Sequence, residues 1–121
     1  MPGALRVVAW NAEWAPPGGV RGRRVAAQLA SVRPDVVCLT EGFEALLPSG
    51  GHVAVSEPPA ERLDVPGARR ALLWSRTALH DVDPVGDPEL PHEAFVGART
   101  VTAIGEVDLM CVCIPWADAG V

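Results

Sequence analysis

Two oxygen-bearing side chains, Asn11 and Glu41, each end a strand-like segment of the sequence, residues 4–10 and 35–40. Hard divalent cations such as Mg²⁺ prefer oxygen ligands and retain several waters, so one carboxylate and one amide oxygen can form the protein's share of a site. A cation held there polarises a phosphoryl oxygen and stabilises a leaving oxygen, while a base elsewhere activates water. If the fold brings Asn11 and Glu41 together, they can support metal-dependent phosphoester chemistry.

Both residues also have an ordinary explanation. Asn stabilises turns through its side-chain oxygen, and an exposed Glu is usually only solvated. Taken on spacing alone, this structural explanation is favoured. The case for a site therefore depends on the elements that position the two side chains.

A helix is predicted between the two segments. Val25, Leu29 and Val32 recur at i, i+4 and i+7, which is the pattern of an amphipathic surface helix beginning near Arg21. Pro34 ends it. The order strand, helix, strand predicts a βαβ unit with parallel strands. Asn11 and Glu41 would then share the carboxyl edge of the sheet, where open α/β sheets bind ligands.

The pattern beyond Gly42 predicts shorter elements: a helical turn, several strands and a Pro-rich acidic loop. A tight hairpin is expected at Gly105-Glu106, with Gly105 at positive φ. The expected turn spans residues 43–47, the strands residues 52–56, 70–76, 94–104 and 107–114, and the loop, with at most one edge strand, residues 80–92.

The composition indicates one globular domain and limits its partners. The chain has 121 residues, 49% of them hydrophobic, and a net charge of −5. An acidic chain is poorly suited to wrapping nucleic acid through counterion release, so a nucleic-acid-binding domain is disfavoured. The sequence contains no apolar run of the roughly 20 residues that cross a bilayer, and we expect no membrane partner.

The three cysteines predict a reduced, cytoplasmic setting, because Cys38, Cys111 and Cys113 are odd in number and lie in apolar surroundings. Cys111 and Cys113 are two apart on a predicted strand, so both point to one face. A zinc or redox site would need further converging ligands. We therefore expect all three to act as small buried hydrophobic residues.

Two linked motifs carry a family resemblance. Residues 6–11, Arg-Val-Val-Ala-Trp-Asn, resemble the opening strand of the endonuclease/exonuclease/phosphatase superfamily, and residues 33–41 resemble its second motif, in which Pro-Asp leads an apolar strand to a metal-binding Glu. Thr40 stands where that motif usually has Gln. The later segments 70–75 and 97–114 agree in order, so the resemblance extends over nearly the whole chain and is sharp over the first 41 residues.

The resemblance implies an α/β fold: one half of a DNase-like four-layer α/β sandwich, with a mixed sheet and at least one amphipathic helix. Residues 1–121 would be the N-terminal half of the domain, with the C-terminal half absent. Asn11 and Glu41 would hold Mg²⁺ or Mn²⁺. Glu41 would be catalytic, and so would Arg99, whose planar guanidinium suits a phosphate oxygen. The substrate would be a phosphoester of unknown class.

The sequence also departs from the family. Many relatives finish the last strand of this region with an active-site His, whereas this chain reads Cys-Ile-Pro-Trp at residues 113–116. The family's Asp-x-Asn motif and its terminal Asp-His or Ser-His, which supplies the base, have no counterpart. We therefore expect these 121 residues to bind metal weakly and to catalyse nothing by themselves.

Two functions remain open at this stage. The first is the N-terminal portion of a divalent-metal-dependent phosphoester hydrolase of nuclease or phosphatase type. The alternative is a noncatalytic binding or self-associating module derived from that fold, which would cover an unpaired sheet edge with a second copy. Fold analogy cannot choose among DNA, RNA and small phosphoesters as substrates.

Overall fold

The computed structural model describes residues 3–89 and 92–114, which form one α-helix, three short 3₁₀-helices and two β-sheets. The first sheet contains, in spatial order, β1 (Val7–Asn11), β2 (Val36–Phe43), β4 (Ala68–Ser75) and β3 (His52–Val55). The second contains β5 (Leu79–Asp83), β6 (Phe95–Thr102) and β7 (Gly105–Val112). The helices are α1 (Val20–Ser31), η1 (Glu44–Leu46), η2 (Ala60–Arg62) and η3 (His92–Ala94).

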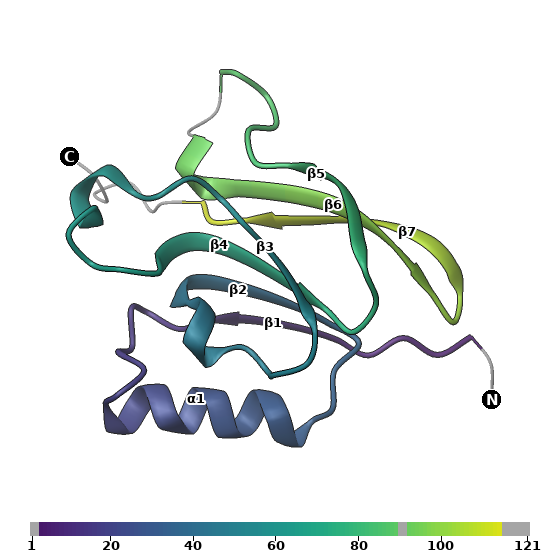
Figure 1. Cartoon of the computed structure of the whole chain (residues 1–121), viewed down its shortest axis with the longest axis horizontal. Helices are drawn as coiled ribbons and strands as arrows, with labels where there is room; N and C mark the ends of the chain where they lie inside the picture. Colours follow the sequence, from purple (N-terminus) through teal and green to yellow (C-terminus); the bar gives the residue numbers. More distant parts are fainter. Residues whose placement is uncertain (1–2, 90–91, 115–121) are drawn as a thin grey trace.

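The predicted βαβ unit is confirmed. β1 and β2 are parallel, and their register runs from Val7 opposite Val36 to Asn11 opposite Thr40. The connecting helix α1 packs on one face of the first sheet (Figure 1). Its buried residues include Val25 and Leu29, as the apolar spacing predicts.

Gly22 of α1 allows the helix to contact the loop before it. A Cβ at this position would lie 1.9 Å from the carbonyl oxygen of Pro16, a backbone atom that cannot move aside cheaply. The close approach of helix and loop therefore requires a glycine here.

The second sheet packs on the face of the first sheet that is opposite α1, so the described chain has three layers (Figure 1). The side chains of β2 and β4 point alternately into two hydrophobic cores, one beneath α1 and one between the two sheets. In β2, Val37 and Leu39 join the core beneath α1, whereas Cys38 faces the second sheet. Leu72 and Leu73 of β4 divide in the same way. Strands buried on both faces are apolar throughout, which is why they read as continuous hydrophobic runs.

The predicted fold class is confirmed in these layers. The first sheet is mixed, because β2 runs parallel to β1 and antiparallel to β4. α1 is the amphipathic helix that was expected. None of the described helices combines the length and the apolar composition that a bilayer-spanning helix needs.

The β6–β7 hairpin is confirmed, but its loop lies two residues earlier than the predicted position, residues 105–106. Thr102 pairs with Gly105, so Ala103 and Ile104 form a two-residue loop. The Thr102 hydroxyl accepts a hydrogen bond from the Ile104 N–H and donates one to the Gly105 carbonyl. Gly105 has φ +108°, the positive value that was predicted.

The prediction of a free thiol at Cys38 and at Cys111 is wrong. The two residues form a disulfide that joins β2 to β7, with their Cα atoms 5.5 Å apart. The spacing of cysteines along the sequence does not show which strands face one another across two sheets, so this pairing was missed. Cys113 is free and buried. The cytoplasmic prediction rested on reduced cysteines and loses that basis.

A hydroxyl cluster links the two sheets near the amino end of β2. The Thr100 hydroxyl lies 2.6 Å from that of Thr77 and 3.3 Å from that of Ser75, and it donates a hydrogen bond to the Ala78 carbonyl. Ser75 and Thr100 are both completely buried. Their polar atoms are thus paired inside the contact between the sheets, as buried hydroxyl groups must be.

The disulfide gives a first prediction. Replacing Cys38 and Cys111 by Ser removes a link between residues 73 apart in sequence, and this should lower the free energy of unfolding by about 2–4 kcal/mol. Urea denaturation with and without a reductant measures the effect. Wild-type protein should lose stability on reduction, whereas the Cys38→Ser/Cys111→Ser variant should not respond.

Cys113→Ser is the matched control, because it removes a buried thiol outside the disulfide. This variant should keep the response to reductant. An identical denaturation midpoint for oxidised and reduced wild-type protein would contradict a stabilising disulfide.

Candidate functional site

The structure brings the backbones of Asn11 and Glu41 to the same edge of the first sheet. Asn11, the last residue of β1, is paired with Thr40, the residue before Glu41. The loop after β1 is tied to β2 at this point, because the Ala12 N–H donates to the Thr40 carbonyl at 2.9 Å and the Trp14 N–H donates to the Glu41 carbonyl at 2.7 Å. The edge is the one that the βαβ unit predicted.

Backbone strain is concentrated at this edge. Glu41 has φ +48°, and Glu13 and Trp14 have φ +49° and +61°. Residues with a Cβ rarely adopt this left-handed conformation, which costs on the order of 1–3 kcal/mol when the surroundings impose it. Such outliers cluster at functional sites, and three of the five non-glycine residues with positive φ in the described chain lie at this edge, whereas Arg33 and Asp81 lie elsewhere.

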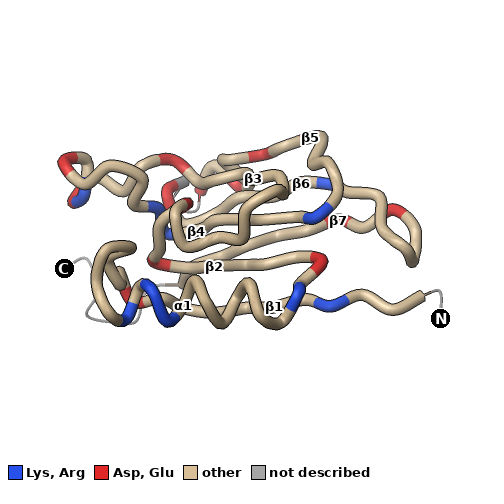
Figure 2. Tube along the Cα trace, turned by 60° about the horizontal axis from the view of Figure 1, so that its bottom comes forward, with Lys and Arg blue, Asp and Glu red and all other residues tan. Residues whose placement is uncertain are grey.

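An arginine that the sequence analysis did not select lies beside Glu41. Arg70 of β4 is 15% exposed at its side chain, and its Nη1 lies 3.9 Å from Glu41 Oε2. It also forms ion pairs with Glu61 of η2 and Glu93 of η3. Figure 2 shows acidic and basic positions together at this end of β2 and β4. The available sequence signal was a pair of arginines, residues 69 and 70, in an otherwise apolar strand.

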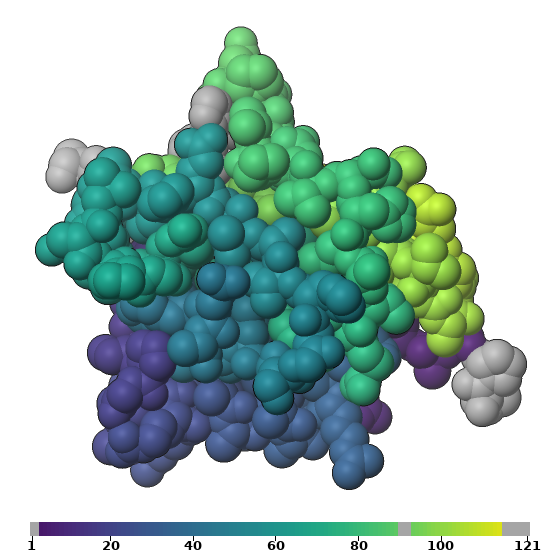
Figure 3. Space-filling model, in the orientation of Figure 1, coloured from purple at the N-terminus to yellow at the C-terminus, as the bar shows by residue number. Residues whose placement is uncertain are grey.

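Trp14 forms a wall of the same edge. The guanidinium carbon of Arg62 lies 4.1 Å from the centroid of the Trp14 ring, and that of Arg70 lies 5.8 Å from it. Figure 3 shows the purple loop after β1 directly beside the teal segment that contains η2. Cation–π contacts of this kind fix the two segments relative to each other.

Cys113 also lies near Glu41. Burial raises the pKa of its thiol, the charge of Glu41 raises it further, and Arg70 acts in the opposite direction. A thiol with a raised pKa stays protonated at neutral pH and is a poor nucleophile and metal ligand. Cys113 opens the segment in which the family resemblance led us to expect a His, and Pro115 and Trp116 lie outside the described residues.

The donors at this edge fit a hard cation that takes most of its ligands from elsewhere. Asn11 is exposed, and its Oδ1 accepts a hydrogen bond from the Glu13 N–H at 2.9 Å, which orients the amide and leaves one lone pair. The Glu41 side chain is 24% exposed. Within residues 3–89 and 92–114, His, Cys, Asp and Glu side chains form no cluster of three or more with metal-site geometry. The Asn11 amide oxygen and the Glu41 carboxylate are donors of the kind that Mg²⁺ or Mn²⁺ takes together with water and phosphate oxygens, whereas a structural zinc site takes Cys and His ligands.

A groove of about 320 Å³ adjoins Asn11. Arg21 of α1 closes part of it by donating a hydrogen bond to the Ala12 carbonyl at 3.3 Å. The groove is lined by Trp10, Asn11, Ala12, Glu13, Arg21, Arg24 and Val25. Asn11 therefore shares this groove with Arg21 and Arg24, and Glu41 is not among the residues that line it.

The structure does not bring Arg99 to Asn11 and Glu41. Ala98 and Thr100, its neighbours in β6, are buried, so strand alternation turns Arg99 away from the core. Its Nε donates a hydrogen bond to Asp108 Oδ1 at 2.7 Å, and Glu106 lies 3.5 Å from its Nη1. The pKa of Arg99 is raised, first by the hydrogen bond to Asp108 and then by the charges of Asp108 and Glu106. These carboxylates occupy the guanidinium that the resemblance assigned to phosphate.

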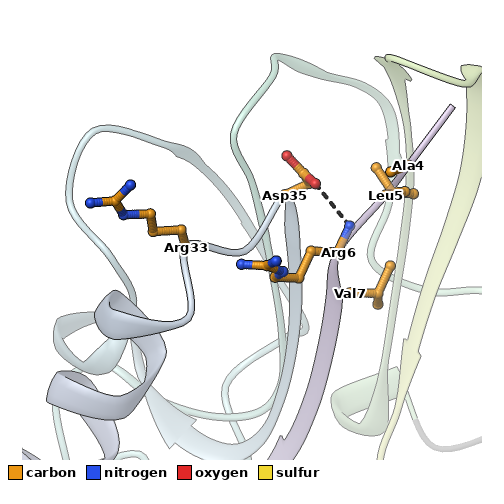
Figure 4. Close-up of a pocket in the computed structure, with 6 residues that line it drawn as sticks. All are labelled: Ala4, Leu5, Arg6, Val7, Arg33 and Asp35. Atoms are coloured by element: carbon orange, nitrogen blue, oxygen red, sulfur yellow. Dashed lines mark hydrogen bonds between the residues drawn. The ribbon is translucent and has the colours of Figure 1, made fainter. Parts of the chain in front are cut away.

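A larger groove lies at the opposite end of the first sheet (Figure 4). There the Arg6 N–H donates to Asp35 Oδ2 at 2.8 Å, and the Arg6 guanidinium donates to the Val32 carbonyl at the end of α1. Arg76 also donates to Asp35. These contacts join the start of β1 to the connection between α1 and β2, and we interpret this groove as structural.

Comparison with known proteins tests the fold. No protein-family model and no curated protein sequence matches the chain. Solved structures do match. The endonuclease domain of TRAS1, a telomere-specific non-LTR retrotransposon, is 18% identical with a TM-score of 0.61 over 92% of this chain and 46% of that one. The 3′ phosphatase NExo from Neisseria, bound to product DNA hairpin, is 21% identical with a TM-score of 0.60 over 90% and 41%.

Sphingomyelinase C from Streptomyces griseocarneus is 14% identical to the chain, with a TM-score of 0.62 over 96% of this chain and 51% of that one. The chain thus spans about half the length of the structures it matches. At these identities the likeness shows the fold alone. Over about half of the length of these structures, the chain shares the endonuclease/exonuclease/phosphatase fold, the fold that the resemblance of its first two motifs implied.

Proposed function

We propose that the chain contributes a cation-binding edge to a divalent-metal-dependent phosphoester hydrolase of nuclease or phosphatase type. The observation that carries this proposal is that Asn11 and Glu41 lie at the same edge of two parallel strands in this fold, with Asn11 in register with Thr40, the residue before Glu41. Backbone strain at Glu41 adds support. The activity of the whole protein is part of the proposal, since the matched structures are about twice as long.

Each residue at the edge has a distinct task in this proposal. Glu41 supplies negative charge to Mg²⁺ or Mn²⁺, and Asn11 supplies a neutral oxygen whose direction is fixed by the Glu13 N–H. The bound cation would supply Lewis-acid polarisation of a phosphoryl oxygen. Trp14 shields one side of the edge. Arg99 is left out, because its guanidinium is bound to Asp108.

The substrate class is proposed only as a phosphoester. The matched structures include an endonuclease domain, a phosphatase bound to DNA and a sphingomyelinase, so the fold is compatible with nucleic-acid and lipid substrates. The net charge of −5 favours recognition at a local site over broad contact with a polyanion.

Glu41→Gln gives the direct test. The substitution removes the carboxylate charge and keeps the side-chain size, so metal-dependent hydrolysis by the full-length protein should fall by about 100-fold or more. Hydrolysis of bis-p-nitrophenyl phosphate with Mg²⁺ or Mn²⁺ measures this, with EDTA as the metal-free reference. Circular dichroism should show an unchanged fold.

Glu44→Gln is the matched control, since Glu44 is an exposed carboxylate three residues from Glu41. It should leave the rate unchanged. Undiminished hydrolysis by Glu41→Gln would remove Glu41 from the mechanism.

A specific observation supports the second candidate, a noncatalytic self-associating module. Met110, Val112 and Ile114 follow one another along one face of β7 and just beyond it, and are 72%, 44% and 84% exposed. In the described part of the chain, β7 pairs only with β6 and is an edge strand. Exposed apolar side chains on an unpaired edge favour association with another strand.

If this second candidate holds, Met110→Lys/Val112→Lys should convert a dimer to a monomer, because charges on the apolar face oppose its burial. Light scattering after size-exclusion chromatography measures the mass. Val82→Lys, on the edge strand β5 and 49% exposed in the wild-type protein, is the control and should leave the mass unchanged. A monomeric wild-type chain would reject self-association.

A further inference from the structure

We propose that Arg70 is a positioning residue that lowers the affinity of Glu41 for a divalent cation by acting as its internal counterion. This inference rests on the proposed function, because it assigns Glu41 to the cation. It concerns a different residue, and a property that can be measured without hydrolysis.

Arg70 is held in place without help from Glu41. Its closest carboxylate contact is Glu61, and its Nε lies 4.0 Å from Glu93 Oε1. Glu93 is itself fixed, because its Oε2 accepts a hydrogen bond from the Ala60 N–H at 2.9 Å. The side chain of Arg70 is also only 15% exposed. Glu61 is therefore the direct carboxylate contact of the guanidinium, and Glu93 lies about as far from it as Glu41 does.

Glu41 interacts with Arg70 through charge alone, because Arg70 Nη1 and Glu41 Oε2 lie 3.9 Å apart, which is longer than a direct hydrogen bond. Glu41 is nevertheless close enough for a substantial Coulomb interaction in a partly buried setting. A cation that binds Glu41 must give up this attraction and accept repulsion from the guanidinium. Both terms weaken cation binding.

Arg70 lies within 4.0 Å of the three carboxylates Glu41, Glu61 and Glu93, so the carboxylates outnumber the guanidinium at this point. Arg70 therefore reduces the negative potential at Glu41 without cancelling it.

A purely structural role for Arg70 predicts a different result. Arg70 joins β4 to η2 and η3, so its loss would lower stability in any case. A structural link alone would not change the affinity of Glu41 for Mn²⁺ in the folded protein. The affinity is therefore the measurement that separates the two roles.

The experiment is a Mn²⁺ titration of the 121-residue chain by isothermal calorimetry and by electron paramagnetic resonance of free Mn²⁺. Arg70→Gln should bind Mn²⁺ roughly threefold to tenfold more tightly than wild type, and this gain should shrink at high salt. Arg70→Lys keeps the charge and should stay within about twofold of wild type. Arg33→Gln removes the same charge at the opposite end of the sheet (Figure 4) and should have no effect.

Unchanged or weaker Mn²⁺ binding by Arg70→Gln would overturn the inference. So would a gain that persists in the Glu41→Gln background, because the effect would then not act through Glu41. If Arg70→Gln does not fold, Arg70→Met replaces it, because Met keeps an unbranched apolar stem and removes the charge. It should also bind Mn²⁺ more tightly, so unchanged or weaker binding would then overturn the inference.

The failures of the two proposals can be told apart. Mn²⁺ binding that Glu41→Gln does not diminish would overturn the proposed function and this inference together. Binding that depends on Glu41 but does not tighten in Arg70→Gln would overturn the role of Arg70 alone.

Discussion

Burial of β2 and β4 on both faces is the constraint on which the rest of the structure depends. Each strand must supply apolar side chains to α1 on one side and to the second sheet on the other. Val37 and Leu39 do this toward the helix, and Cys38 toward β7. Because almost every position of these strands is inside, charged groups can be accommodated only where the strands end.

The candidate site follows from that constraint. Glu41 is a partly exposed position of β2, and its left-handed backbone interrupts the regular pairing with β4. Arg70 lies beside it on β4, with its side chain mostly buried, and carboxylates from η2 and η3 compensate its charge. The same physics that excludes charge from the interior thus gathers one arginine and three glutamates at one edge.

The opposite end of the sheet shows that an arginine-lined groove is not sufficient to indicate function. Arg6 there donates to the Val32 carbonyl at the end of α1, and its backbone N–H ties Asp35 to the start of β1, so its charge is used within the fold. Arg99 is similar, because Asp108, its register partner on β7, occupies its guanidinium. Arg70 differs, because Glu41, one of the three carboxylates near its guanidinium, is the residue proposed to hold a cation.

The sequence by itself determined the βαβ unit and the common edge of Asn11 and Glu41, because apolar periodicity and the order of strand, helix and strand are local features of the chain. It could not determine the Cys38–Cys111 disulfide, the outward direction of Arg99 or the carboxylates around Arg70. Those depend on how segments far apart in sequence stack across two sheets and on which face each strand turns to its neighbour. Only the tertiary structure decides that, because packing both faces of the central strands fixes the layers, and the layers fix which distant side chains meet.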